Sequence, residues 1–114
     1  MRIAIACISF LIAGSPALAQ KFRVLPPEEF DHPYTGPSVI VRARDQDHVR
    51  EMCPGMKFNL GVALGCSFRR PNGVCLIIMA PDAVIEAAGH SPDVVRRHEM
   101  AHCSGWPADH RGAR

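Results

Sequence analysis

The hydrophobic pattern is most regular in the middle of the chain. Apolar side chains alternate with other residues over 60–68, and an almost uninterrupted apolar run follows at 74–80. Alternation is typical of a strand with one buried face, whereas a short continuous apolar run is typical of a strand that is buried on both faces. Pro-Asn-Gly at 71–73 supplies a turn between the two runs. The pattern therefore predicts a β-hairpin.

Local signals predict further elements on both sides of the hairpin. Residues 38–43 are rich in β-branched side chains, which favours a strand. Asp45 is a suitable N-cap for a short helix that stops at the Pro-Gly pair 54–55. Residues 81–90 predict another short helix that ends at Gly89.

The clearest helix start lies near the end of the chain. Ser91 is a good N-cap, Pro92 suits the first helical position, and Asp93 complements the helix dipole. Gly105 is a natural C-terminal stop. The order of arm, strand, helix, hairpin, helix and tail predicts a small α+β fold. In it, an antiparallel sheet containing the hairpin packs on the last helix, and disulfides brace the structure.

The N-terminus has the pattern of a secretory signal peptide. Arg2 precedes an apolar run at 3–13, and Ala-Leu-Ala at 17–19 is a typical cleavage site. The alternative is an uncleaved membrane anchor, but the run is shorter than the roughly 18 residues that a span needs. The sequence therefore predicts a signal peptide at 1–19 and a secreted or periplasmic protein, with no membrane association after cleavage.

The mature part reads as one small unit. Proline-rich residues 20–37 predict an extended N-terminal arm, and residues 38–114 predict a single domain. Without Arg2 the chain has 12 basic residues against 11 acidic ones. Neither this balance nor the distribution of charge provides the basic stripe of a nucleic-acid-binding protein, so nucleic acid is not a predicted partner.

Cysteines remain in an even number once the signal peptide is removed, because Cys7 leaves with it. An even number in a short exported chain is typical of disulfides. The spacings do not include the Cys-x2-Cys or Cys-x4-Cys pairs of a four-cysteine metal site. The sequence therefore predicts two disulfides among Cys53, Cys66, Cys75 and Cys103, with three possible pairings.

One pairing is favoured by the predicted hairpin. If Arg69 pairs with Val74, Cys66 and Cys75 share a face of the sheet, and each can reach a different helix. This register predicts the pairs Cys53–Cys66 and Cys75–Cys103. A direct Cys66–Cys75 bond remains an alternative.

The candidate chemistry lies on the last predicted helix, where residues 98–102 read His-Glu-Met-Ala-His. On a helix, His98 and His102 lie one turn apart on the apolar stripe, so two imidazole nitrogens come within reach of one ion. Glu99 lies beside them and could act as general base toward a metal-bound water. The alternatives are a chance pentapeptide and a pair of hydrogen-bonded core histidines.

The stretch HEMAHCSGWPADH at 98–110 resembles the active-site helix of zincin zinc metallopeptidases. The glycine at 105 is similar to the metzincin pattern HExxHxxGxxH. The resemblance implies that His98 and His102 are zinc ligands, that Glu99 is the catalytic base, and that the glycine turns the chain back toward the metal. The third metzincin histidine would fall at Ala108, which cannot bind zinc, so the resemblance names no subfamily.

A third zinc ligand is therefore needed from another position. His110 is the favoured candidate, because the chain can turn back at Gly105 and Pro107 and offer an imidazole. Asp109 is the alternative ligand, or it could orient the neighbouring histidine as an acceptor. An upstream residue or a partner protein completing the site also stays open.

Together these features predict an exported, zinc-dependent metallohydrolase that is peptidase-like and acts on a peptide or protein substrate. The strand at 74–80 would offer an edge to an extended substrate, and a larger partner could complete the small site. Two alternatives remain. One is a non-catalytic exported binding module with a structural metal, and the other is a degenerate, metal-free zincin used for binding.

Overall fold

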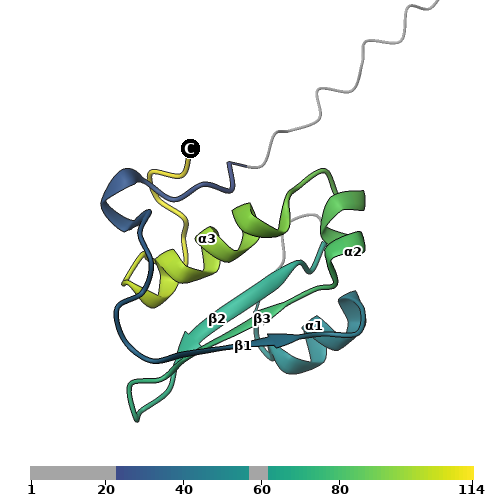
Figure 1. Cartoon of the computed structure of the whole chain (residues 1–114), viewed down its shortest axis with the longest axis horizontal. Coiled ribbons are helices and arrows are strands. Elements are labelled where there is room, and N and C mark those ends of the chain that lie inside the picture. Colours follow the sequence, from purple (N-terminus) through teal and green to yellow (C-terminus); the bar gives the residue numbers. More distant parts are fainter. Residues whose placement is uncertain (1–22, 57–61) are drawn as a thin grey trace, which may run out of the picture.

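The computed structural model describes residues 23–56 and 62–114. In this part of the chain, three short strands form one mixed sheet with the order β1-β3-β2 (Figure 1). They are β1 (Ser38–Arg42), β2 (Gly65–Arg69) and β3 (Cys75–Met79). β2 and β3 form the predicted antiparallel hairpin, whereas β1 pairs with β3 in parallel. The α+β class is confirmed, but the prediction of a purely antiparallel sheet is wrong.

The parallel pairing follows from the length of the connection. The chain passes through a helix and through β2 before it enters β3, and a long crossover of this kind is what a parallel pair requires. The sequence pattern of a short strand is the same in both orientations, so it could not reveal the direction of β1.

The described helices are α1 (Gln46–Met52), α2 (Asp82–Ala87) and α3 (Pro92–Cys103), with a 3-10 turn, η1 (Glu28–Phe30), in the arm. The predicted caps are confirmed. The Asp45 carboxylate accepts a hydrogen bond from the backbone N–H of His48, and the Ser91 hydroxyl accepts one from that of Val94. Gly105 follows the end of α3 with a φ of 105°, a conformation that glycine adopts at little cost.

The hairpin register differs from the predicted one by one residue. Arg69 pairs with Cys75, and the backbone N–H of Arg70 donates to the carbonyl of Val74 at 2.8 Å. The connecting turn places Gly73 at a φ of 84°, as in hairpins with three-residue loops. A shift of one residue turns every side chain to the other face. Cys66 and Cys75 therefore lie on opposite faces of the sheet, and the prediction of a shared face is wrong.

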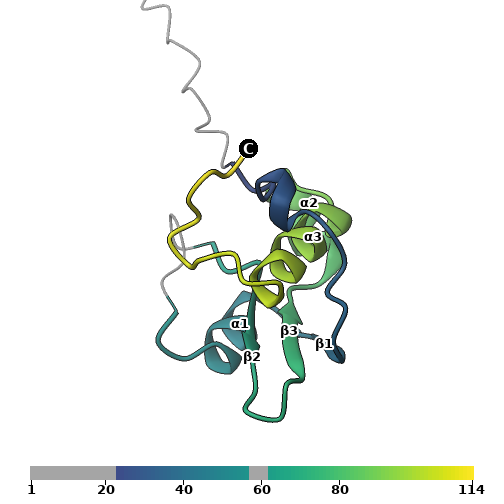
Figure 2. The same ribbon diagram turned by 90° about the vertical axis from the view of Figure 1, so that its left-hand side faces the viewer.

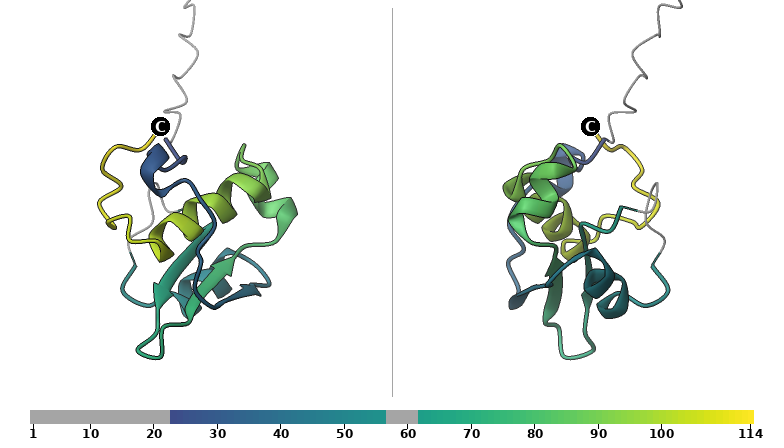
Figure 3. Two further views of the ribbon diagram at one scale, coloured as in Figure 1. Left: turned by 60° about the vertical axis from the view of Figure 1, so that its left-hand side comes forward. Right: turned by 90° about the vertical axis from the view of Figure 1, so that its right-hand side faces the viewer.

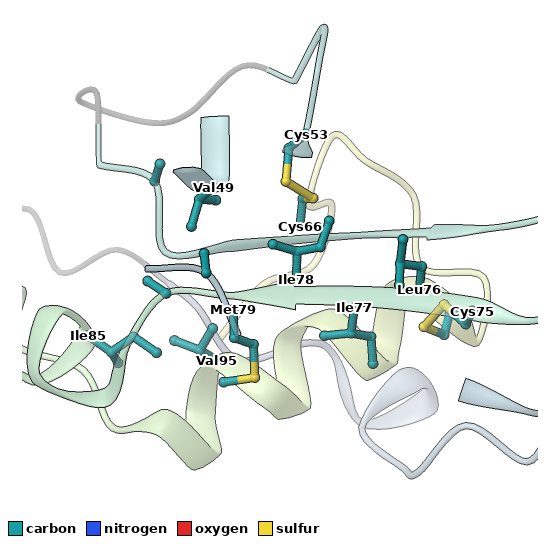
Figure 4. Packing of buried hydrophobic residues seen from close by; sticks show 14 residues of the cluster. Val49, Cys53, Cys66, Cys75, Leu76, Ile77, Ile78, Met79, Ile85 and Val95 are labelled. Atoms are coloured by element: carbon teal, nitrogen blue, oxygen red, sulfur yellow. A yellow bond between two sulfur atoms is a disulfide. The ribbon is translucent and has the colours of Figure 1, made fainter. Parts of the chain in front are cut away.

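The core lies on both sides of β3, whose five residues are all buried. α3 covers one face of the sheet and α1 the other, as Figures 2 and 3 show from three directions. In the close view of Figure 4, Val95 lies on the same side of β3 as Ile77 and Met79, and Val49 lies on the side of Ile78. The near-continuous apolar run of β3 is thus explained by burial on both faces, as predicted.

Each face of the sheet has its own disulfide. Cys53 at the end of α1 is bonded to Cys66 of β2, and Cys75 of β3 is bonded to Cys103, the last residue of α3. The predicted pairing is confirmed, and it works because each strand cysteine meets the helix on its own face. Two disulfides are compatible with an extracellular location.

β3 has a hydrogen-bonded neighbour on each side, so it offers no free edge. The expectation that residues 74–80 present an edge to a substrate is wrong. In the described sheet the open edges belong to β1 and β2.

The described part of the arm, from residue 23 onward, is extended apart from η1 and runs beside the C-terminal tail. Leu25 and Arg114 exchange both backbone hydrogen bonds, at 3.1 and 2.7 Å. None of the described helices is both long and apolar enough for a membrane span. The predicted signal peptide 1–19 and the beginning of the predicted strand at 60–61 lie outside the described residues.

Candidate metal centre

Three histidines come together where α3 meets the tail. His98 and His102 lie one turn apart on α3, and His110 returns to them from the tail. Their candidate ligand atoms all lie within 4.8 Å of one another. The Nε2 atom of His102 is 3.3 Å from that of His98 and 3.0 Å from that of His110. These three side chains could hold a metal ion, and they are the three that the sequence singled out.

Backbone carbonyl groups orient both helix histidines. Nδ1 of His98 lies 2.6 Å from the carbonyl oxygen of Val24, and Nδ1 of His102 lies 2.8 Å from that of Trp106. A carbonyl oxygen only accepts, so each Nδ1 carries the proton and each neutral ring turns the lone pair of Nε2 toward the other. Two lone pairs facing each other at 3.3 Å repel unless a positive charge lies between them. Histidine ligands of metals are usually held in this way.

Burial keeps these imidazoles in their neutral form. It is the main cause that lowers the pKa of His98, of His102 and of His110 below the ordinary value of histidine. For His102, the neighbouring imidazoles lower the pKa further, because two positive charges so close repel each other. A neutral ring is the form that binds a metal, so the cluster suits a metal ion better than a bound proton.

A tight loop brings the third histidine back. After Gly105, the backbone N–H of Trp106 donates to the carbonyl of Ala101 at 3.0 Å, and that of His110 donates to Pro107 at 3.1 Å. His110 has a φ of 56° and is the only non-glycine residue with a positive φ in the described part of the chain. Such a backbone conformation is unfavourable for a residue with a Cβ and tends to occur at functional sites.

Asp109 is not part of the cluster. Its carboxylate accepts hydrogen bonds from the side chain of Arg111, the shortest at 2.7 Å, and these bonds hold the pKa of Asp109 below its usual range. The structure therefore brings His110 to the other histidines and leaves the alternative ligand, Asp109, paired with an arginine.

Glu99 is buried, with 5% of its surface exposed. The hydroxyl of Ser67, on β2, donates to Oε2 of Glu99 at 2.7 Å and also lies 3.0 Å from its backbone carbonyl. Burial raises the pKa of Glu99 to about 7, although the hydrogen bond from Ser67 acts against it. A carboxyl group with this pKa can accept and release a proton near neutral pH.

A glycine lies beside this carboxyl group. A Cβ atom at Gly65 would come within 3.3 Å of Oε1 of Glu99 and within 2.7 Å of the Ile78 carbonyl oxygen. Any other residue would crowd both the sheet and the carboxyl group, so glycine keeps this side of Glu99 free of a side chain.

No pattern in the sequence indicated the groups that orient the site residues. The carbonyl of Val24 and the hydroxyl of Ser67 come from segments far from α3 in the chain. A backbone carbonyl has no residue signature, and Ser67 turns toward α3 only in the actual hairpin register, where it pairs with Ile77. Outside the cluster, His48 accepts a hydrogen bond from the backbone N–H of Arg44 at 3.0 Å.

Comparison of the chain with protein-family models, with curated proteins and with solved structures found no match.

Proposed function

We propose that this chain is an exported, zinc-dependent metallohydrolase of the zincin type that cleaves a peptide bond. The observation that carries the proposal is the convergence of three imidazole Nε2 atoms, two of them on rings whose Nδ1–H groups are held by carbonyl oxygens. A tetrahedral zinc ion with Zn–N distances of about 2.0–2.1 Å separates its nitrogen ligands by about 3.4 Å. The separations of 3.3 and 3.0 Å are close to that value.

The ligand set favours a catalytic site over a structural one. Structural zinc sites usually have four protein ligands, whereas catalytic sites have three and leave one position open. Within the described residues, the group that could hold a metal contains three histidines. Because His110 comes from the same chain, a partner protein is not needed to complete the ligand set.

In the proposed reaction, Glu99 accepts a proton from the attacking water and passes it to the leaving amine. Bound zinc supplies polarisation of the scissile carbonyl and lowers the pKa of water. The pKa of Glu99, raised to about 7 by burial, suits both proton transfers. Ser67 holds the carboxyl group in place from β2, and Gly65 leaves room beside it.

A peptide or protein substrate would lie along β2 rather than β3. Within the described sheet β2 has a hydrogen-bonded neighbour on one side only, and two of its residues, Gly65 and Ser67, adjoin Glu99. An extended chain can bind to such an edge through backbone hydrogen bonds. Export through the signal peptide at 1–19 is part of the proposal, and the disulfides are compatible with it.

Metal analysis of the purified, oxidised mature protein tests the first half of the proposal. We expect about one zinc ion per chain, loss of zinc in the double variant His98→Ala/His102→Ala, and weaker binding in His110→Ala. Asp109→Ala is the matched control, because Asp109 adjoins His110 but bonds to Arg111. Full zinc retention by the double variant would disprove the site.

Hydrolysis tests the second half. Glu99→Gln should keep the fold and the zinc and abolish cleavage of a peptide library. If cleavage continues unchanged in this variant, Glu99 is not the base. If the wild-type protein binds zinc tightly and cleaves nothing, the alternative of a binding module with a structural metal is correct. A folded protein without zinc would instead be a degenerate zincin.

A further inference from the structure

Trp106, the only tryptophan of the chain, is buried next to the candidate metal centre. Only 2% of its surface is exposed, yet it does not belong to the apolar cluster around β3. Its neighbours are the histidines. The indole stacks on His102 with 4.7 Å between ring centroids and an interplanar angle of 15°, and its centroid lies 5.1 Å from those of His98 and His110. One rigid ring therefore touches all three imidazoles.

The polar groups of Trp106 connect the two segments that carry these histidines. Its carbonyl oxygen accepts the hydrogen bond from Nδ1 of His102, on α3. Its indole Nε1–H donates at 2.9 Å to the carbonyl of Arg111, the residue that follows His110 in the tail. The first bond sets the ring orientation of a helix histidine, and the second holds the tail in the position that brings back the third histidine.

We propose that Trp106 is a positioning residue of the metal centre, which holds His110 against the two helix histidines. The inference rests on the metal-binding part of the proposed function and not on hydrolysis. Without the indole, the hydrogen bond from Trp106 to the carbonyl of Arg111 is lost. The three imidazole rings also lose the aromatic surface against which they pack. Replacement of Trp106 should therefore weaken metal binding, since loss of a group that holds a metal ligand typically lowers metal affinity about 10- to 100-fold.

A residue that only fills space behaves differently. Its substitution lowers the stability of the fold but leaves the metal affinity of the folded molecules unchanged. Ile85 is the matched control, because it is fully buried and belongs to the apolar cluster around β3. Trp106→Phe keeps an aromatic ring and removes the indole N–H, whereas Trp106→Leu removes both.

The test measures the affinity of Co²⁺ for the oxidised protein by its visible absorption, under conditions where each variant is folded. We expect Trp106→Phe to bind Co²⁺ about 10- to 100-fold more weakly than wild type, Trp106→Leu to bind more weakly still, and Ile85→Val to bind as wild type does. In the Trp106→Phe background, His110→Ala should cost much less affinity than it costs in the wild type, because His110 is already misplaced. Equal affinities of Trp106→Phe and wild type would overturn the inference. So would a double variant Trp106→Phe/His110→Ala whose fold-loss of affinity is the product of the two single losses.

A second measurement uses the wild-type protein and so does not depend on whether the variants fold. Bound Co²⁺ should quench the fluorescence of Trp106, with the same half-saturation as the absorption titration, and quenching should vanish in His98→Ala/His102→Ala. Binding of Co²⁺ without quenching would contradict the contact on which the inference rests. A wild-type protein that binds no Co²⁺ would instead disprove the metal centre itself.

Discussion

The two ends of α3 lie in different surroundings. Toward its N-terminus, Val95 packs into the apolar core on β3, where contacts are numerous and not directional. Toward its C-terminus, His98 and His102 lie in a corner where their Nδ1–H groups donate hydrogen bonds to carbonyl oxygens of the arm and the tail. The core stabilises the fold through buried apolar area, which tolerates small shifts. The histidine corner depends on a few bonds with defined directions, and each of them has one donor and one acceptor.

This difference predicts that stability and metal binding depend on different parts of one helix. Substitutions in the core, apart from the Cys75–Cys103 bond that joins it to the last turn of α3, should change the free energy of unfolding and leave metal affinity unchanged. Substitutions in the corner should mainly change metal affinity. The arm and the tail contribute little to the core cluster, but they supply the acceptor for His98 and the whole of His110. The experiments below test this separation, from the largest expected effect to the smallest.

The largest expected effect is the removal of a core disulfide. The loops closed by Cys75–Cys103 and Cys53–Cys66 have sequence separations of 28 and 13. Chain-entropy arguments give them about 3.5 and about 3 kcal/mol of stability. We expect Cys53→Ala/Cys66→Ala to lose about 3 kcal/mol in urea unfolding and to bind zinc as tightly as wild type when folded. Weaker zinc binding in this variant would show that the core and the corner are not separate.

Glu99 lies where the two regions meet, and its replacement should affect stability in a pH-dependent way. Its pKa is raised to about 7 in the folded chain from an ordinary value of 4.5, so the folded state holds a proton that the unfolded state has released. The stabilisation is complete below the unfolded pKa and is lost as the pH rises through the folded pKa. Glutamine imitates the protonated form at every pH.

In the metal-free protein we therefore expect Glu99→Gln to match wild type at about pH 4 and to be more stable by up to about 3 kcal/mol at pH 8. Thermal unfolding of both proteins across this range, with a chelator present, measures the difference. The histidines titrate in both proteins, so their contribution largely cancels. A difference that stays constant with pH would show that the pKa of Glu99 is not raised in the folded chain.

The smallest expected effect comes from the ion pairs of Asp31. Its carboxylate accepts hydrogen bonds from Arg97 on α3, at 2.6 Å, and from Arg114 in the tail, at 2.7 Å. The bond from Arg97 is the main cause that holds the pKa of Asp31 below its usual range. This contribution to stability is present above the unfolded pKa and is lost as the pH falls through the folded one.

Asp31→Asn should therefore lower the melting temperature slightly at neutral pH, and the loss should shrink in high salt, because the pairs are close to solvent. It should also weaken zinc binding less than Trp106→Phe does, since Asp31 binds the tail at Arg114, whereas Trp106 binds it at Arg111, directly after His110. Asp93→Asn is the control: Asp93 pairs with Arg96 on the same helix and joins no separate segments. A larger loss of zinc affinity in Asp31→Asn than in Trp106→Phe would place the main support of the corner in the arm.

The sequence predicted the parts of this molecule that depend on local signals. Ser91 and Gly105 mark the ends of α3, and the spacing of His98 and His102 places them together on it. The disulfide pairing was also predicted, because it required only that each strand cysteine reach a different helix.

The remaining parts depend on contacts between distant segments. The hairpin register was wrong by one residue, which placed Cys66 and Cys75 on one face and turned Ser67 away from α3. The direction of β1 and the carbonyl of Val24 depend on how the chain returns in space, and neither leaves a pattern in the sequence.

The position of Cys103 directly after His102 has a consequence for how the molecule is assembled. The covalent bond to Cys75 fixes the last turn of α3, and this turn carries one of the proposed zinc ligands. By thermodynamic reciprocity, if oxidation of the disulfide favours zinc binding, bound zinc disfavours reduction of the disulfide to the same degree. The two events are then mutually reinforcing steps of maturation. With such a coupling, the chain would hold its metal weakly in a reducing compartment and would keep both the metal and the disulfide in an oxidising one.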